Sequence, residues 1–252
     1  MTSAVAPLLY GYVFLALALG GLIKGVVGVG LPLVGISLLG LVLDPRLVLA
    51  ILVAPIVATN LRQSFATGLP REGIRRFWPL IALFIVATWG GALLLVQINT
   101  ALLLAILGVI VVIFSALNLA SPKLYLPPRH ERWAGPTVGL AAGLLNGIST
   151  VNGPPLVMYL MSLRLEKDTF VAAYGLIALC GAIPLAISYA AVGVLGWREL
   201  WLSMLALIPV FVGMWAGERI RHRINPVLFQ RVLLITLIVL GLNLIRRGVF
   251  GG

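Results

Sequence analysis

The sequence predicts an all-α integral membrane protein made of two homologous, inverted repeats, each with a broken, re-entrant helix and about three transmembrane helices. Three observations lead to this fold class. The 252 residues are 61% hydrophobic and only 10% charged, with a mean hydropathy of +1.13, which is too apolar for a water-soluble core. The apolar residues gather in long segments separated by short basic loops, as in the positive-inside pattern of membrane proteins. The order of these segments recurs once along the chain.

Ten apolar segments follow one another in two sets of five. They cover residues 8–27, 31–43, 47–65, 77–96 and 101–119 in the first set, and 136–151, 154–163, 170–192, 200–217 and 226–245 in the second. A helix needs about 20 residues to cross the hydrocarbon of a bilayer. The segments 31–43 and 154–163 are therefore too short to cross alone, and we predict that they are half-helices.

The second set repeats the first at a displacement of 123 residues. This displacement aligns Gly30 with Gly153, Pro32 with Pro155, Leu33 with Leu156, Val34 with Val157, Trp78 with Trp201 and Gly90 with Gly213. We therefore divide the chain into a first transmembrane repeat at 1–122, a basic cytoplasmic linker at 123–135 and a second transmembrane repeat at 136–252. Duplication with breaks in corresponding positions is typical of transporters that bind substrate between the repeats near the bilayer midplane. A duplication kept for packing alone is the alternative.

The way in which each broken segment crosses decides the orientation of the repeats. If each is a re-entrant V, each half has an odd number of spans and the halves are inverted. If each is one kinked span, there are eight spans and the halves are parallel. The V arrangement puts most loop arginines and lysines on the cytoplasmic side, so we favour it. Four arginines then face the outside of the membrane: Arg46, Arg198, Arg246 and Arg247. In both arrangements, 62–76 and 123–132 face the cytoplasm.

The first break, GVVGVGLPLVG, follows a lysine inside an apolar segment. Gly25, Gly28 and Gly30 permit close backbone approach and positive φ, and Pro32 suits the first turn of a new helix. Lys24 costs about 2.5 to 3.5 kcal/mol at membrane depth and is by default a functional-site hypothesis. The Asp and Glu residues all fall in loops or at segment ends, so we expect an anion beside Lys24. A side chain that snorkels to the interface or pairs with a nearby carbonyl is the alternative.

The second break, NGISTVNGPPLV, has the same character. Asn152 or Gly153 is expected to cap a helix whose first residues are Pro154 and Pro155. Two helix N-termini would then face the middle of the protein. Their N–H groups and positive dipole ends favour an anion, although proline removes one donor in the first helix and two in the second.

A third polar cluster lies in the segment 47–65. Thr59, Asn60 and Gln63 are three to four residues apart and share one helix face, which we expect to point away from lipid. Interhelical hydrogen bonding is an equal alternative for this face, whereas Arg62 is expected to reach the interface. The counterpart stretch, YGLIALCGAIPLAISY, is less polar, so the site is expected to be weighted toward the first half.

We expect the three clusters to form one anion-binding site. Its predicted residues are Lys24, Gly28, Gly30, Leu31, Thr59, Asn60, Gln63, Asn146, Thr150, Asn152 and Gly153, with Ser149 beside them.

Other function classes lack the residues they need. His130 and His222 lie in basic loops far from the breaks, and neither a nucleophile–base spacing nor a metal-ligand spacing appears. We therefore predict no enzyme, no metal site and no cofactor. The single cysteine, Cys180, has no disulfide partner. The net charge of +11 comes from clusters between apolar segments, so no nucleic-acid partner is predicted.

The two breaks resemble those of the sulfite exporter TauE/SafE family, also described as the 4-toluene sulfonate uptake permease family. The resemblance rests on GVVGVGLPLVG and GISTVNGPPLV, on Trp78 and Trp201, and on the small-residue turns TWGGALL and FVGMWAG, and it covers essentially the whole chain. It implies a membrane transporter for sulfite, thiosulfate, sulfonates or small carboxylates, without choosing among them.

We therefore expect a secondary transporter that moves a sulfur oxyanion or an organosulfonate by alternating access, held by two half-helix N-termini and Lys24. With no Asp, Glu or His at membrane depth, either Lys24 carries a coupling proton or the protein is a facilitator driven by the anion gradient and the membrane potential. The expected partners are the small anion and the lipid bilayer of a bacterial inner membrane, and a homodimer is left open. A non-transporting scaffold or assembly subunit is the alternative.

Overall fold

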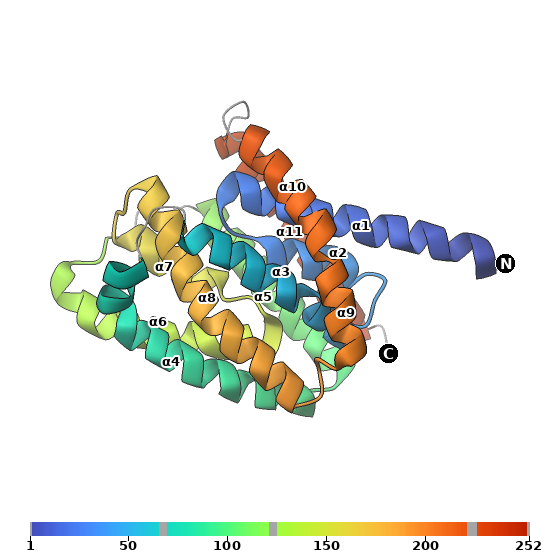
Figure 1. The fold of residues 1–252 in the computed structure, drawn as a ribbon, viewed down its shortest axis with the longest axis horizontal. Helices are drawn as coiled ribbons and strands as arrows, with labels where there is room; N and C mark the ends of the chain where they lie inside the picture. The colour runs from blue at the N-terminus through green and yellow to red at the C-terminus, as the bar shows by residue number, and fades with distance from the viewer. Residues whose placement is uncertain (1, 66–69, 121–124, 221–225, 251–252) are drawn as a thin grey trace. The chain divides into compact units, whose positions relative to one another are not determined.

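A computed structural model describes residues 2–65, 70–120, 125–220 and 226–250. Every regular element in these ranges is an α-helix, which confirms the all-α prediction (Figure 1). The helices are α1 (Thr2–Val27), α2 (Leu31–Leu39), α3 (Pro45–Ser64), α4 (Pro70–Gln97), α5 (Thr100–Ala120), α6 (Pro128–Ser149), α7 (Gly153–Ser162), α8 (Lys167–Ala191), α9 (Trp197–Leu205), α10 (Leu207–Ile220) and α11 (Pro226–Phe250).

Seven helical stretches among the described residues are long and apolar enough to cross a membrane. They lie in α1, α3, α4, α5, α8, the α9–α10 pair and α11. This number agrees with the prediction that the chain crosses the membrane several times. Whether α1 with α2, and α6 with α7, cross as a re-entrant V or as a kinked span stays a prediction.

The two segments predicted to be half-helices are short helices. α2 has 9 residues and α7 has 10. At 1.5 Å per residue they are about 14 and 15 Å long, which is half the thickness of a typical hydrocarbon core of about 30 Å. Each follows a longer helix after a break of three residues, at 28–30 and 150–152.

The chain forms two compact units, and each unit takes helices from both sequence halves. Unit 1 comprises Met1–Pro55, Thr100–Leu119 and Trp201–Gly252, and unit 2 comprises Ile56–Asn99 and Ala120–Leu200. The repeat boundaries at 1–122, 123–135 and 136–252 concern duplication of the sequence and stay a prediction. Residues 128–135 of the predicted linker form the first turns of α6, whereas 123–124 lie outside the described residues.

In unit 2, α4 and α6 lie along each other at a crossing of small residues (Figure 1). A Cβ atom at Gly91 would overlap the carbonyl oxygen of Leu144 and would lie 3.0 Å from the Cα of Gly147. A Cβ atom at Gly147 would in turn overlap the carbonyl oxygen of Thr88. Small residues let the backbones of membrane helices approach closely, and here no larger residue fits.

In unit 1, α1 and α10 cross in the same way (Figure 1). A Cβ atom at Gly217 would overlap the carbonyl oxygen of Leu22 and would lie 3.1 Å from the Cα of Gly25, and a Cβ atom at Gly25 would overlap the carbonyl oxygen of Met214. In both units, therefore, the first helix of one sequence half packs on the fourth segment of the other half.

These crossings correct one expectation from the sequence. The stretches TWGGALL and FVGMWAG are not turns, because they lie inside α4 and α10. Their glycines remove side chains where another helix passes. The equivalent triplets are Trp89-Gly90-Gly91 and Trp215-Ala216-Gly217, whose tryptophans are 40% and 51% exposed.

A proline inside α3 is compensated from α9 within unit 1. Pro55 has no N–H to donate to the carbonyl of Ile51, one turn earlier. The hydroxyl of Ser203 donates to this carbonyl oxygen at 2.9 Å and accepts the N–H of Ala54 at 2.8 Å. A serine from a neighbouring helix thus satisfies the carbonyl that the proline leaves without a donor, as the absence of water in hydrocarbon requires.

Candidate functional site

The first break lies in unit 1 between α1 and α2. The N–H of Gly28 donates to the carbonyl of Lys24 at 2.8 Å, which closes the last turn of α1. Gly28 and Gly30 have φ of 91° and 108°, as predicted from the glycines. α2 begins at the fully buried Leu31, and Pro32 gives it no second N–H. Its free end therefore offers few backbone donors, chiefly those of Leu31 and Leu33.

Lys24 is buried beside this break, with 3% of its surface exposed. It is the one charged residue among the buried polar side chains of the described ranges. One turn earlier on α1, a Cβ atom at Gly20 would lie 3.0 Å from the side chain of Leu31. Because residues four apart share a helix face, Lys24 lies on the side of α1 that faces the start of α2.

The second break lies in unit 2 between α6 and α7. Thr150 has a φ of 57°, and its N–H donates to the carbonyl of Asn146 at 2.7 Å. Asn152, rather than Gly153, is the N-cap residue of α7, but its side chain makes no capping hydrogen bond. The hydroxyl oxygen of Thr150 is buried and has no hydrogen-bond partner in the described structure.

The two breaks share most of their backbone pattern, with an offset of 122 residues, but the N-cap Gly30 has a φ of 108° and the N-cap Asn152 a φ of −97°. In each, a left-handed residue binds the carbonyl four residues back, a valine and an N-cap residue follow, and the next helix starts. The pattern pairs Lys24 with Asn146, Gly28 with Thr150, Val29 with Val151, and Gly30 with Asn152. The displacement of 123 residues aligns identical amino acids, such as Gly30 with Gly153. The backbone conformation and the N-cap positions align at 122 residues instead.

A network of hydrogen bonds fills the second break. Asn146 donates to the hydroxyl of Thr88 at 3.2 Å and to the carbonyl of Gly181 at 3.4 Å. Asn152 donates to the side-chain oxygen of Asn146 at 3.0 Å, and the hydroxyl of Tyr174 donates to Asn152 at 2.9 Å. The two predicted asparagines thus bind each other and the neighbouring helices α4 and α8.

The polar face at the end of α3 is buried within unit 2. Thr59, Asn60 and Gln63 are at most 5% exposed, whereas Arg62 is exposed. A Cβ atom at Gly175 of α8 would lie 2.7 Å from the Cβ of Gln63. This face therefore packs on α8 next to Tyr174, and such packing favours interhelical contact as one role for these side chains.

Two functional candidates were missed in the stretch described as less polar. Tyr174 and Tyr189 are buried, and the hydroxyl of Tyr189 donates to the carbonyl of Gly147 at 2.9 Å. Tyrosine usually finds a hydrogen-bond partner when it is buried. The sequence could have indicated both residues, because they stand at the two ends of an apolar segment.

Replacing Tyr174 with phenylalanine is expected to destabilise the protein by about 0.6 to 1 kcal/mol, because Asn152 loses a donor inside the membrane. Thermal unfolding in detergent measures this change. Tyr125→Phe is the control, because Tyr125 is 57% exposed. Equal melting temperatures for Tyr174→Phe and the wild type would contradict a stabilising role for this hydroxyl.

The predicted site residues fall into two groups. Unit 1 holds Lys24, Gly28, Gly30 and Leu31, and unit 2 holds Thr59, Asn60, Gln63, Asn146, Ser149, Thr150, Asn152 and Gly153. Each group is brought together within its own unit, and a single site made from both groups stays a prediction. Among the described residues, no three His, Cys, Asp or Glu side chains could hold a metal ion.

Comparison with known proteins gives one match. A family model described as sulfite exporter TauE/SafE matches residues 13–244. Neither the curated proteins nor the solved structures contain a match. The family match spans both breaks and both helix crossings. This multi-pass membrane protein therefore belongs to the sulfite exporter TauE/SafE family, a family of membrane transporters of sulfur compounds.

Proposed function

We propose that the protein is a secondary transporter of a small sulfur-containing anion, and that the anion binds at the first break. The observation that carries this proposal is the burial of Lys24 beside the start of α2. Its ammonium has three N–H donors, so a contact within the protein does not exhaust it. The N–H of Leu31 and the positive end of α2 add to the attraction for an anion.

Comparison of the two breaks supports a binding role for the first. Lys24 stands where the second break has Asn146, whose side chain is bound by Thr88 and Asn152. Gly147 lies against the carbonyl of Thr88 as Gly25 lies against that of Met214, so Met214 is the residue of the first break that corresponds to Thr88. By their N-cap positions, Gly30 corresponds to Asn152. The first break therefore has a charge in place of an amide, and a glycine without a side chain at its cap.

Alternating access is proposed from the duplicated architecture. The common backbone pattern of the breaks and the common glycine contacts of the crossings support two related repeats, which we propose to be inverted. In transporters of this kind, one part rocks against another around a site formed by broken helices.

The proposed substrates are sulfite, thiosulfate and organosulfonates, and small carboxylates are the alternative. A bacterial inner membrane is the proposed location. An inside-negative potential would favour export, by about 2.3 kcal/mol per charge per 100 mV. Coupling through a proton on Lys24 and uncoupled facilitation are the two proposed modes of transport. A non-transporting scaffold is the rival function.

A ligand panel tests the proposal. Purified protein is heated in detergent with sulfite, thiosulfate, ethanesulfonate, acetate or a divalent metal. A true substrate at a hundredfold excess over its dissociation constant adds about 2.7 kcal/mol of stability. We expect a sulfur oxyanion or a sulfonate to raise the melting temperature most and to be taken up by proteoliposomes. No shift with any anion, together with no uptake, would favour the scaffold.

A further inference from the structure

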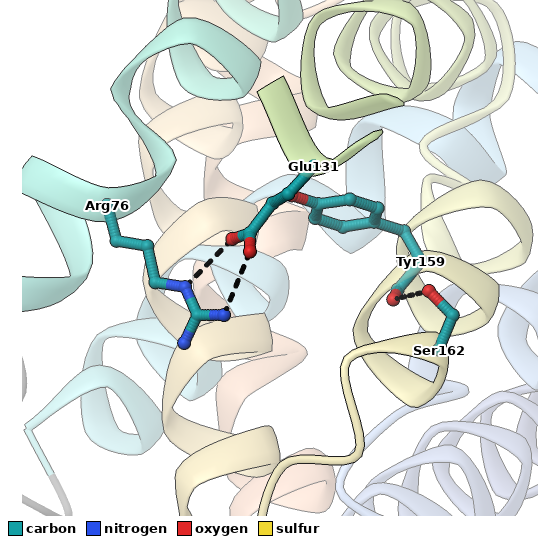
Figure 2. Close-up of polar contacts among 4 residues, drawn as sticks. All are labelled: Arg76, Glu131, Tyr159 and Ser162. Carbon is teal, nitrogen blue, oxygen red and sulfur yellow. Dashed lines mark hydrogen bonds and ion pairs between the residues drawn. The ribbon is translucent and has the colours of Figure 1, made fainter. Parts of the chain in front are cut away.

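A second polar site lies in unit 2, away from the second break, where α4, α6 and α7 meet. It is a pocket of about 280 Å³. Its lining includes Arg76, Phe77 and Leu80 of α4, Glu131 and Arg132 of α6, and Tyr159 of α7. Figure 2 shows Arg76 and Glu131 facing each other and the ring of Tyr159 reaching from α7 toward Glu131.

An ion pair organises one wall of this pocket. Arg76 binds Glu131 through two N–H groups, at 2.8 Å from Nε and at 3.2 Å from Nη2 (Figure 2). The guanidinium carbon of Arg76 also lies 5.3 Å from the centre of the Phe77 ring. A guanidinium has five N–H donors, so Arg76 is held in place with donors still available to a ligand.

The charge of the pocket selects for a single negative charge. Arg76 and Arg132 contribute two positive charges and Glu131 contributes one negative charge. A bound group with one negative charge would make the pocket neutral, whereas a doubly charged anion would leave it negative. The apolar lining of Phe77, Leu80 and Pro136 indicates that the ligand also has an apolar part.

The surroundings of the pocket are typical of a membrane interface. Trp78 and Trp133, each next in sequence to a lining residue, are 63% and 75% exposed. Exposed tryptophans gather at the level of lipid headgroups, and arginines concentrate on the cytoplasmic side. Both arrangements considered from the sequence put this end of α4 and α6 in the cytoplasm.

We propose that this pocket binds the phosphodiester of an anionic phospholipid, with Arg76 and Arg132 on the phosphate and Tyr159 beside it. A phosphodiester carries one negative charge and is joined to apolar chains, and it lies at the depth that the tryptophans mark. The site does not depend on transport, so it can fail while the proposed function holds.

The test compares the melting temperature in nanodiscs of phosphatidylcholine with that in nanodiscs containing phosphatidylglycerol. The wild type is expected to melt at a higher temperature with phosphatidylglycerol. Arg76→Gln and Arg132→Gln are expected to lose this increase. Arg75→Gln and Arg129→Gln are matched controls that should keep it, because both residues are exposed and lie outside the lining. Equal loss in the controls would overturn the proposal.

Glu131→Gln separates lipid binding from a purely structural ion pair. This variant removes the one negative charge of the pocket lining and frees donors of Arg76, so its increase with phosphatidylglycerol is expected to exceed that of the wild type. The exposed Glu166→Gln is the control. An unchanged or smaller increase in Glu131→Gln would overturn the proposal.

Soluble anions test whether the ligand of the pocket is a lipid headgroup or a free anion. Ethanesulfonate and inorganic phosphate, added to phosphatidylcholine nanodiscs, are expected to have no effect that depends on Arg132. A stabilisation by ethanesulfonate that is lost in Arg132→Gln would overturn the lipid assignment and would make the pocket a site for soluble anions.

Discussion

Lys24→Met is expected to weaken anion binding, and uptake with it, by about one to two orders of magnitude, while leaving the ligand-free protein about as stable as the wild type. Loss of a charge-assisted contact costs about 1.5 to 3 kcal/mol, or roughly 10- to 150-fold in affinity. The ligand-free protein loses a buried charge and also the contact that Lys24 makes, so the two effects on stability oppose each other. Uptake by proteoliposomes and melting temperatures with and without the anion measure both effects.

Further substitutions at Lys24 separate charge from hydrogen bonding. Lys24→Asn gives the first break the side chain that the second break has at Asn146, and we expect it to bind no anion. Lys24→Arg keeps the charge and should retain part of the binding. Arg198→Gln removes a charge from an exposed position and is the control. A lower melting temperature of ligand-free Lys24→Met, with the anion effect intact, would show that the lysine is structural.

Gly91→Ala is expected to destabilise the protein by about 3 kcal/mol, at the upper end of the usual cost of overpacking. Its methyl group would overlap the carbonyl oxygen of Leu144 and crowd the Cα of Gly147. These are backbone atoms, so no side-chain rotation relieves the overlap, and α4 must move away from α6. Thermal unfolding and size-exclusion chromatography in detergent measure the loss of stability and of a uniform fold.

The adjacent glycine provides a matched control for this prediction. A Cβ atom at Gly90 would meet only the end of the Leu144 side chain, at 4.0 Å, so Gly90→Ala is expected to change stability by less than about 0.5 kcal/mol. If both variants unfold at the wild-type temperature, the close crossing of α4 and α6 does not exist in the membrane protein.

The helices and the breaks could be predicted from the sequence because their signals are local. Apolar runs indicated the helices, and their lengths distinguished α2 and α7 from spanning helices. Gly28 and Gly30 indicated positive φ, which the structure confirms. One local interruption was not predicted: the apolar segment 200–217 is divided into α9 and α10 near Ala206. The cause is Pro209, which has no N–H to donate to the preceding turn.

The parts that depend on distant contacts could not be predicted. The apolar pattern does not say which helix packs on which. The crossing of α4 with α6 depends on Gly91 and Gly147, and the sequence alone does not indicate that these two glycines meet. Matching of letters gave an offset of 123, whereas the left-handed caps at Gly28 and Thr150 require 122. The role of Tyr174 depends on Asn152, which is 22 residues away.

The exchange of helices between the two sequence halves also constrains how the chain matures. Ribosomes deliver α1 to the membrane well before its partner α10, whereas only α5 separates α4 from its partner α6. During synthesis the glycine faces of α1 and α4 therefore meet lipid or the insertion machinery first. Unit 2 has all of its residues once the chain has reached Leu200, whereas unit 1 needs the last helices of the chain. We therefore expect unit 2 to become compact before unit 1.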